Sequence, residues 1–426
     1  MEALLHLIWQ QRLYTSLSPT LHDTWRELEV IDTGLYNADA GPDFLNAKIR
    51  IDGILWSGDV EIHQSAQEWY QHRHQHNPLY QSVVLHLVVE LGAPTYDLKG
   101  RLIPSCQMTY PEVLNQRACY LVHHSQELPC APLTNTLTEP EWQNWYETLL
   151  HQRLEHRLNV LHDWMGRHQS DRLEALYMLL MRYFGFGLNN DAMERLARNL
   201  PLRYLLKHRD QLHLLEALLL GQAGLLSQLP QDAYTKQLRQ EHQFLAHKYQ
   251  LAPPLPSNAF RLTRTRPASF PTRRLVQIAN LIHRHDFLSD LCLEIDSERA
   301  LKRTFDVELK NTYWLSHASW SGKGRLSETS VRMLGINVVI PYQSLVAELD
   351  SRSELRVRAN QLLKSLPAED NRPIRLFARA GLTASNASDS QALLELYKMY
   401  CQRRKCLFCH FGRAKMCVPL DKQTQP

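Results

Sequence analysis

The chain has 426 residues and a formal net charge of +4, and 44% of its residues are hydrophobic and 22% are charged. At about 150 residues per domain, this length predicts two or three domains, and the composition excludes a disordered or fibrous protein. No run of about 18 apolar residues occurs, so we expect neither a membrane-spanning helix nor a membrane partner.

The amino-terminal segment, "MEALLHLIWQQRLY", predicts an amphipathic helix with Leu4, Leu5, Ile8 and Trp9 facing inward. The segment lacks the basic start and the small-residue cleavage site of a signal peptide. We therefore expect a cytoplasmic protein. Because the cytoplasm is reducing, the eight cysteines are expected to be thiols or metal ligands rather than disulfides.

Hydrophobic periodicity along the chain predicts an α+β fold in three parts. Residues 1–132 combine a helix with strands, among them the β-branched run 82–90, and predict a sheet domain. Residues 133–369 have apolar residues at three- and four-residue steps, which predicts a mostly helical domain. Residues 370–426 predict a helix followed by a short cysteine-bearing tail.

The segment 41–63, "GPDFLNAKIRIDGILWSGDVEIH", predicts a β-hairpin whose two-residue turn is Asp52-Gly53. The turn places Ile49 opposite Trp56 and Leu45 opposite Val60, which gives the hairpin one apolar face.

Four side chains share the other, polar face of this hairpin: Lys48, Asp59, Glu61 and His63. Asp43 falls opposite Ile62, on the apolar face. It therefore joins the polar residues only if the chain bends at Gly41-Pro42 or forms a bulge near Gly58. Carboxylates that converge at one end of a sheet are typical ligands of hard divalent cations, so we expect Mg²⁺ or Mn²⁺ here.

The same segment resembles the PD-(D/E)XK nuclease pattern, in which an acid opens one strand and an acid-x-lysine pair lies on the next strand. The resemblance implies a catalytic metal held by three acids: Asp43, Asp59 and Glu61. Glu61 stands where the lysine belongs, so Lys48 is the candidate to stabilise phosphate charge, and His63 is the candidate to deprotonate or orient water. The first helix of the pattern often supplies another glutamate, here Glu2.

A group of histidines follows the hairpin in the sequence: His63, His72, His74, His76 and His86. Histidine is a common metal ligand and a ready proton carrier, so these residues are candidates for a metal site or a general base. The alternative is that His86 is a hydrogen-bonded core residue and that the others line a polar surface.

The stretch from 242 to 285 contains no acidic residue, and its arginines predict contact with the phosphates of a nucleic acid: Arg261, Arg264, Arg266, Arg273 and Arg274. The alternative is a loop whose arginines bridge parts of the protein through carboxylates and carbonyls.

The carboxy-terminal segment "CQRRKCLFCHFGRAKMC" predicts a metal site with four thiolates: Cys401, Cys406, Cys409 and Cys417. The spacing leaves zinc and a 4Fe–4S cluster open, and free thiols are the alternative. Some nucleases that the hairpin resembles complete a cysteine-ligated cluster with an upstream cysteine, which implies Cys130 as an alternative to Cys417.

Strings spread over most of the chain are similar to a bacterial family designated domain of unknown function 2851: "NADAGPDFLNAKI", "WSGDVEIH", "EWYQHRH", "VVLHLVVE", "LEALLLGQAGLL", "RPASFPTRR" and "KCLFCHFG". The resemblance implies that the acid–histidine hairpin, the arginine stretch and the cysteines belong to one recurring unit.

These features together predict a metal-dependent, nuclease-like hydrolase of phosphodiester bonds in DNA or RNA. Two alternatives remain open. One is a non-catalytic nucleic-acid-binding protein built on a degenerate nuclease core, and the other is a metal hydrolase that acts on a small molecule.

Overall fold

The computed structural model describes residues 2–167, 171–256, 258–261, 270–285, 288–306, 308–316 and 324–418. The chain divides into two compact units. The first, which we call the sheet unit, comprises residues 1–145, 375–382 and 394–426. The second, the helical unit, comprises residues 146–374 and 383–393. The predicted three-part division at residues 132 and 369 stays a prediction.

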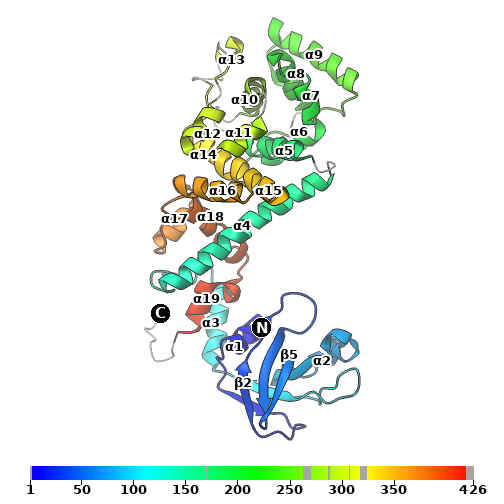
Figure 1. Cartoon of the computed structure of the whole chain (residues 1–426), viewed down its shortest axis with the longest axis vertical. Helices are drawn as coiled ribbons and strands as arrows, with labels where there is room; N and C mark the ends of the chain where they lie inside the picture. The colour runs from blue at the N-terminus through cyan, green and yellow to red at the C-terminus, as the bar shows by residue number, and fades with distance from the viewer. Residues whose placement is uncertain are drawn as a thin grey trace. The chain divides into compact units, whose positions relative to one another are not determined.

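The sheet unit contains a seven-stranded mixed sheet, seen curled in Figure 1. Its strands are β1 (Ser16–Pro19), β2 (Leu28–Asp32), β3 (Leu35–Tyr36), β4 (Phe44–Ile51), β5 (Ile54–Ser65), β6 (Val83–Glu90) and β7 (Ser105–Thr109). The strand order is β1-β7-β6-β5-β4-β2, and β3 also pairs with β4. Strands β5, β6 and β7 are parallel to one another, and the other pairs are antiparallel.

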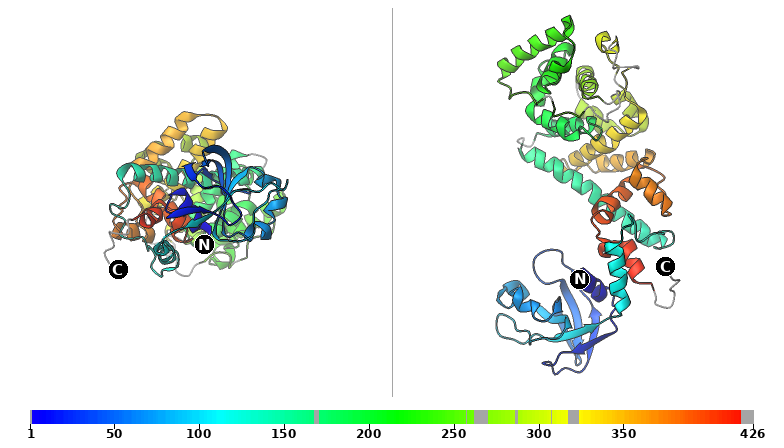
Figure 2. Two further views of the ribbon diagram at one scale, coloured as in Figure 1. Left: turned by 90° about the horizontal axis from the view of Figure 1, so that it is seen from below. Right: turned by 180° about the vertical axis from the view of Figure 1, so that it is seen from behind.

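The sheet unit also contains short helices and turns: α1 (Glu2–Gln10), α2 (Glu68–Gln71), α3 (Glu112–His123), the 3₁₀ turns η1 (His74–His76), η2 (Pro78–Tyr80) and η7 (Cys406–Phe408), the π-helix η6 (Leu396–Cys401) and α19 (His410–Met416). Helix α1 buries the predicted apolar face and packs on β5. Helices α3 and α19 come from distant parts of the sequence and lie side by side (Figure 2).

The helical unit confirms the predicted helical character of the middle of the chain, and its described residues form α5 (Arg172–Phe184), α6 (Asn190–Asn199), α7 (Leu202–Leu206), α8 (Leu212–Gln222), η3 (Leu226–Gln228), α9 (Ala233–Tyr249), α10 (Pro271–Arg284), α11 (Leu288–Glu294), α12 (Glu298–Phe305), α13 (Thr312–Ser316), α14 (Glu328–Leu334), the π-helix η5 (Gly335–Val339), α15 (Ile340–Leu349), α16 (Ser353–Ser365) and α18 (Ala387–Glu395). Helices α4 (Glu139–Arg167), α17 (Arg372–Arg379) and α18 contribute residues to both units. The α+β fold class is therefore confirmed.

A single large cluster of buried leucines, alanines and aromatic residues forms the core of the helical unit. Burial of this apolar surface is the main favourable contribution to its folding. Among the described residues, no helix is both long enough and apolar enough to cross a membrane.

The predicted hairpin forms from β4 and β5. Asp52 and Gly53 have φ angles of 45° and 82°, as the two central residues of a tight hairpin turn require. Ile49 lies opposite Trp56, which confirms the predicted register near the turn.

Candidate metal centre

A β-bulge shifts the register of β4 and β5 by one residue. Phe44, rather than Leu45, lies opposite Val60, so the predicted pairing is wrong beyond this point. Asn46 has a left-handed backbone with a φ of 58°, and its N–H group donates to Asp59 Oδ1 at 2.9 Å. Successive side chains of a strand point to opposite faces, so one extra residue reverses the alternation beyond it.

The shift brings Asp43 to Glu61, which the predicted register allowed only with a bend at Gly41-Pro42 or a bulge near Gly58. Asp43 N–H donates to Glu61 Oε2 at 3.1 Å, and Ile62 N–H donates to Asp43 Oδ2 at 2.9 Å. Burial, together with the charge of Asp43, raises the pKa of Glu61. Two carboxyl groups held this close are stabilised in their charged forms by a cation.

Helix α1 adds two side chains to this acidic pair. Glu2 and His6 are four residues apart and therefore lie on one face of the helix. One ligand atom from each of Glu2, His6 and Asp43 lies within 4.8 Å of the others, and His6 Nε2 is 3.2 Å from Asp43 Oδ1. His6 is only 8% exposed, yet neither of its ring nitrogens makes a hydrogen bond. We call Glu2, His6, Asp43 and Glu61 the candidate metal centre.

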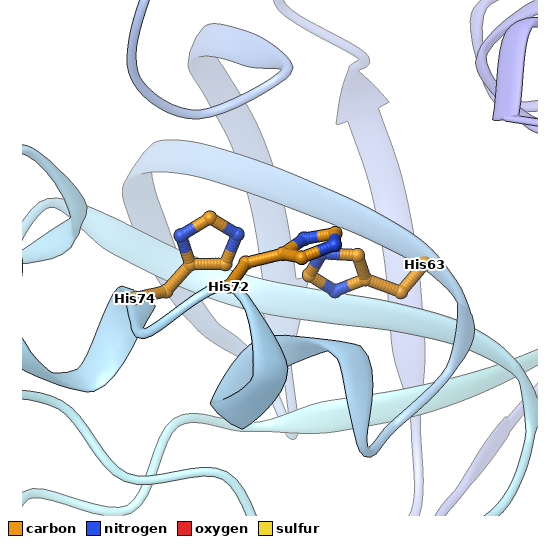
Figure 3. Close-up of side chains that lie close together, drawn as sticks. All are labelled: His63, His72 and His74. Atoms are coloured by element: carbon orange, nitrogen blue, oxygen red, sulfur yellow. The ribbon is translucent and has the colours of Figure 1, made fainter.

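Three histidines form a second group, shown in Figure 3, and two of them lie close to Glu61. This histidine group consists of His63 in β5, His72 at the end of α2 and His74 in η1. One ring nitrogen of each histidine lies within 4.8 Å of the others. Glu61 Oε1 is 3.4 Å from His63 Nε2 and 3.3 Å from His74 Nε2. The carboxyl group of Glu61 thus faces the histidines with one oxygen and Asp43 with the other.

His86 lies beside His63, in β6. His63 Nδ1 and His86 Nε2 are 2.9 Å apart, and His86 Nδ1 is 2.8 Å from Thr95 Oγ1. Burial and the neighbouring histidines lower the pKa of His63 to about 2 and that of His86 to about 3. Both rings are therefore neutral at pH 7. A neutral imidazole whose Nδ1 is engaged in this way can present its Nε2 to a metal.

Aromatic rings hold His74 in position. Tyr80 stacks on it with the ring centroids 3.9 Å apart, and the Tyr80 hydroxyl donates to Gly41 O at 3.2 Å. Trp69 contacts His74 edge-on, and its indole N–H donates to Tyr96 O at 3.1 Å. These contacts preorganise the histidine, because its ring is fixed by packing before any ligand arrives.

The two ligand groups differ in their donor atoms. Glu2, His6 and Asp43 offer two carboxylates and one imidazole, whereas the histidine group offers three imidazoles. Carboxylates suit Mg²⁺ and Mn²⁺, and imidazoles suit transition metals. The mixed donor set at the candidate metal centre therefore favours Mn²⁺ over Mg²⁺.

Asp59 and Lys48 lie elsewhere than the sequence predicted. Asp59 uses one carboxyl oxygen to accept from the Asn46 N–H group and the other to accept from the Ser82 hydroxyl, so it holds the bulge. Among the described residues, no group of three ligand atoms within 4.8 Å includes Asp59. Lys48 is exposed and lies five residues along β4 from Asp43, a distance of about 16 Å in an extended strand. The candidate metal centre therefore includes Glu2 and His6 and does not include Asp59 or Lys48.

The predicted arginines occupy different environments. Arg264 and Arg266 lie outside the described residues, and Arg261 is exposed. Arg273 and Arg274 are buried in α10, where Arg274 packs over the Phe186 ring and donates to Gln277 Oε1. Burial gives these two arginines an internal role in the helical unit, whereas the nucleic-acid contact of Arg261 stays a prediction.

The cysteines predicted from the tail meet an upstream cysteine in the sheet unit. Four thiols line one cavity: Cys130, Cys401, Cys406 and Cys409. Cys417 ends α19 and is exposed. The structure thus brings Cys130, rather than Cys417, to the other three candidate ligands.

His6 is the residue of the candidate metal centre that the sequence analysis missed. Its signal was present, because a glutamate and a histidine four positions apart on an amphipathic helix share one face. The resemblance to the nuclease pattern pointed to Glu2 on this helix but to no histidine, and the contact of His6 with Asp43 depends on tertiary packing.

Comparison with known proteins identifies the family of the chain but supplies no activity. Residues 2–372 match a family model described as a protein of unknown function, DUF2851. No curated protein and no solved structure matches the chain significantly. The matched region contains both ligand groups and the arginine stretch and ends before the carboxy-terminal cysteines. Because the match covers most of the chain, the protein belongs to the DUF2851 family.

Proposed function

We propose that the protein is a metal-dependent hydrolase of phosphodiester bonds, with DNA or RNA as its substrate class and the cytoplasm as its location. The observation that carries this proposal is the convergence of Glu2, His6 and Asp43 beside Glu61. A glutamate on the first helix, an acid that opens one strand and an acid on the next strand are the elements of the PD-(D/E)XK pattern.

If Glu61 rather than Asp59 is the second acid of that pattern, the lysine position moves from Glu61 to His63, two residues further on. Burial keeps the His63 ring neutral at pH 7, so it supplies no fixed positive charge to a phosphate. A bound ion must then supply that charge, which makes the proposed reaction dependent on metal. The histidine group around His63 offers a place for a second ion of the transition series.

The residues of the candidate metal centre have separate roles in the proposed reaction. Glu2, His6 and Asp43 would hold an ion that polarises a phosphoryl oxygen and lowers the pKa of a bound water. The water oxygen forms a bond to phosphorus, and the bond from phosphorus to the leaving oxygen breaks. Glu61 Oε1, which lies 3.4 Å from His63 Nε2, would take the proton of the water once the ion holds Glu61 in its charged form, and the leaving oxygen takes a proton from solvent.

A cleavage assay with matched variants tests the proposal. The wild-type chain, Asp43→Asn and Asp39→Asn are incubated with single-stranded and double-stranded DNA, with RNA and with a small aryl phosphodiester, each with Mn²⁺, Mg²⁺ or a chelator. Asp39 is an exposed carboxylate four residues before Asp43, so its variant makes the same chemical change away from the centre. We expect cleavage with Mn²⁺ that falls by about 100-fold or more in Asp43→Asn only.

Other outcomes of this assay separate the alternatives. Cleavage of the aryl phosphodiester without cleavage of any nucleic acid would favour a small-molecule hydrolase, which the burial of Arg273 and Arg274 also favours. Nucleic-acid binding that survives Asp43→Asn, with no cleavage by the wild type under any metal, would favour a non-catalytic binding protein.

A further inference from the structure

We propose that Cys130, Cys401, Cys406 and Cys409 hold a 4Fe–4S cluster in the sheet unit, and that this cluster keeps α1 in place at the candidate metal centre. Three of the thiols come from the carboxy-terminal segment, and the fourth comes from the loop that follows α3. All four line the same cavity, together with Leu128, Pro129 and Gly412.

Backbone N–H groups point at one of the four thiols, all of which are free cysteines. Burial by itself raises the pKa of Cys409. At the sulfur of Cys409, the backbone N–H groups of Gly412 and Phe411 oppose that rise. N–H groups that point at a sulfur stabilise the thiolate, which is the form that binds a metal.

The separation of the sulfurs favours a cluster over a single zinc ion. Tetrahedral zinc with a Zn–S distance of about 2.3 Å places every pair of its sulfurs about 3.8 Å apart. Among the described residues, no three cysteine sulfurs lie within 4.8 Å of one another. Each thiolate of a 4Fe–4S cluster binds a different iron, so its four sulfurs stand farther apart than those around one ion.

The segments around the cavity pack closely against one another. A Cβ atom at Gly412 would lie 2.0 Å from the Cys406 carbonyl oxygen, so only glycine lets α19 pack this closely on η7. Arg404 Nη1 donates to Gln126 O at 2.9 Å and ties the cysteine segment to the loop that carries Cys130. These contacts hold the cysteine segment close to the loop that carries Cys130, so that both can supply ligands.

The cysteine segment also packs behind the helix of the candidate metal centre. Turn η7, which begins at Cys406, contacts α1. The centroids of the Phe408 and Tyr36 rings are 6.1 Å apart, and those of the Tyr36 and His6 rings are 5.6 Å apart. A cluster that fixes η7 therefore fixes the position of His6. This second part of the inference rests on the proposed metal centre.

Metal and sulfide analysis of the full chain, purified without oxygen, tests the cluster itself. After reconstitution with iron and sulfide, we expect about four iron and four sulfide ions per chain and a broad visible absorption band. Cys130→Ala should lose the iron, and Cys417→Ala, the same change at the exposed cysteine of α19, should retain it. Zinc without iron, no bound metal in the folded wild type, or loss of iron in Cys417→Ala alone would overturn the proposal.

The effect on α1 has a separate readout. In a Mn²⁺ titration, Cys130→Ala should bind Mn²⁺ about tenfold more weakly than Cys417→Ala. Affinity falls by about this much when the residues that orient a metal ligand, here His6, are lost. If the two variants bind Mn²⁺ with equal affinity, the cluster does not position His6. The result of the iron analysis would stand in that case. Absence of Mn²⁺ binding in the iron-loaded wild type would instead refute the proposed metal centre.

Discussion

At the scale of single residues, the strongest evidence for a metal centre is that several buried imidazole nitrogens make no hydrogen bond. Both ring nitrogens of His6 and Nε2 of His74 are of this kind, and each of these residues lies beside a carboxyl group. Native proteins pair most buried polar groups, because an unpaired one costs about 1–3 kcal/mol. A metal ion accepts the lone pair of one ring nitrogen from each histidine and would remove the cost at that nitrogen.

Glu174 in the helical unit provides a residue-level prediction that does not involve the metal. Its two carboxyl oxygens accept from the Leu202 N–H group. Burial raises its pKa to about 7; the charge of Asp171 adds to this rise, and the charge of Arg203 opposes it. A folded-state pKa above the unfolded value of 4.5 means that the folded chain binds the proton more tightly. This contribution to stability is complete below pH 4.5 and is lost as the pH rises through about 7.

We therefore expect Glu174→Gln to stabilise the helical unit at pH 8 by about 1–2 kcal/mol, allowing for partial solvation of the carboxyl group, and to have little effect at pH 4.5. The free energy of unfolding of wild type and variant at the two pH values measures this. An equal effect at both pH values would show that the Glu174 carboxyl group titrates normally.

At the scale of elements, the bulge in β4 decides which acids meet. The exposed Asn46 adopts the left-handed backbone of the bulge, a conformation that glycine adopts freely and that costs a β-branched residue about 1–2 kcal/mol. Asn46→Gly should therefore retain both stability and Mn²⁺ affinity. Asn46→Val should lose about 1–2 kcal/mol of stability and bind Mn²⁺ at least about tenfold more weakly, because Asp43 no longer faces Glu61.

Chemical unfolding and Mn²⁺ titration of the two Asn46 variants check this prediction. Since the side chain is exposed, neither change removes core packing, and the comparison isolates the backbone. If Asn46→Val binds Mn²⁺ as well as Asn46→Gly does, the bulge is not what aligns the acids.

The hairpin also shows how far sequence alone could predict this fold and site. The Asp52-Gly53 turn and the register beside it were predictable, because turn chemistry and alternation act locally. The bulge was not, because a single asparagine in a left-handed conformation has no clear signature among its neighbours. The meeting of His6 with Asp43, and of Cys130 with Cys406, depends on tertiary packing between segments far apart in the chain.

At the scale of the whole molecule, the chain divides into two compact units, and both proposed metal sites belong to the sheet unit. The helical unit has a large hydrophobic core of its own. A ligand that binds only the folded sheet unit should therefore stabilise that unit and have no direct effect on the core of the other. This division makes the location of metal binding measurable in the intact protein.

Hydrogen exchange of the full chain, followed by mass spectrometry with and without Mn²⁺, tests the central claim most directly. The account predicts slower exchange in α1, β4 and β5 when Mn²⁺ is added and unchanged exchange in α8, α9 and α10. It predicts that Asp43→Asn abolishes this protection and that Asp39→Asn retains it. Unchanged exchange in α1, β4 and β5 of the wild type, or equal protection in the two variants, would contradict a metal centre built from helix α1 and the bulged hairpin.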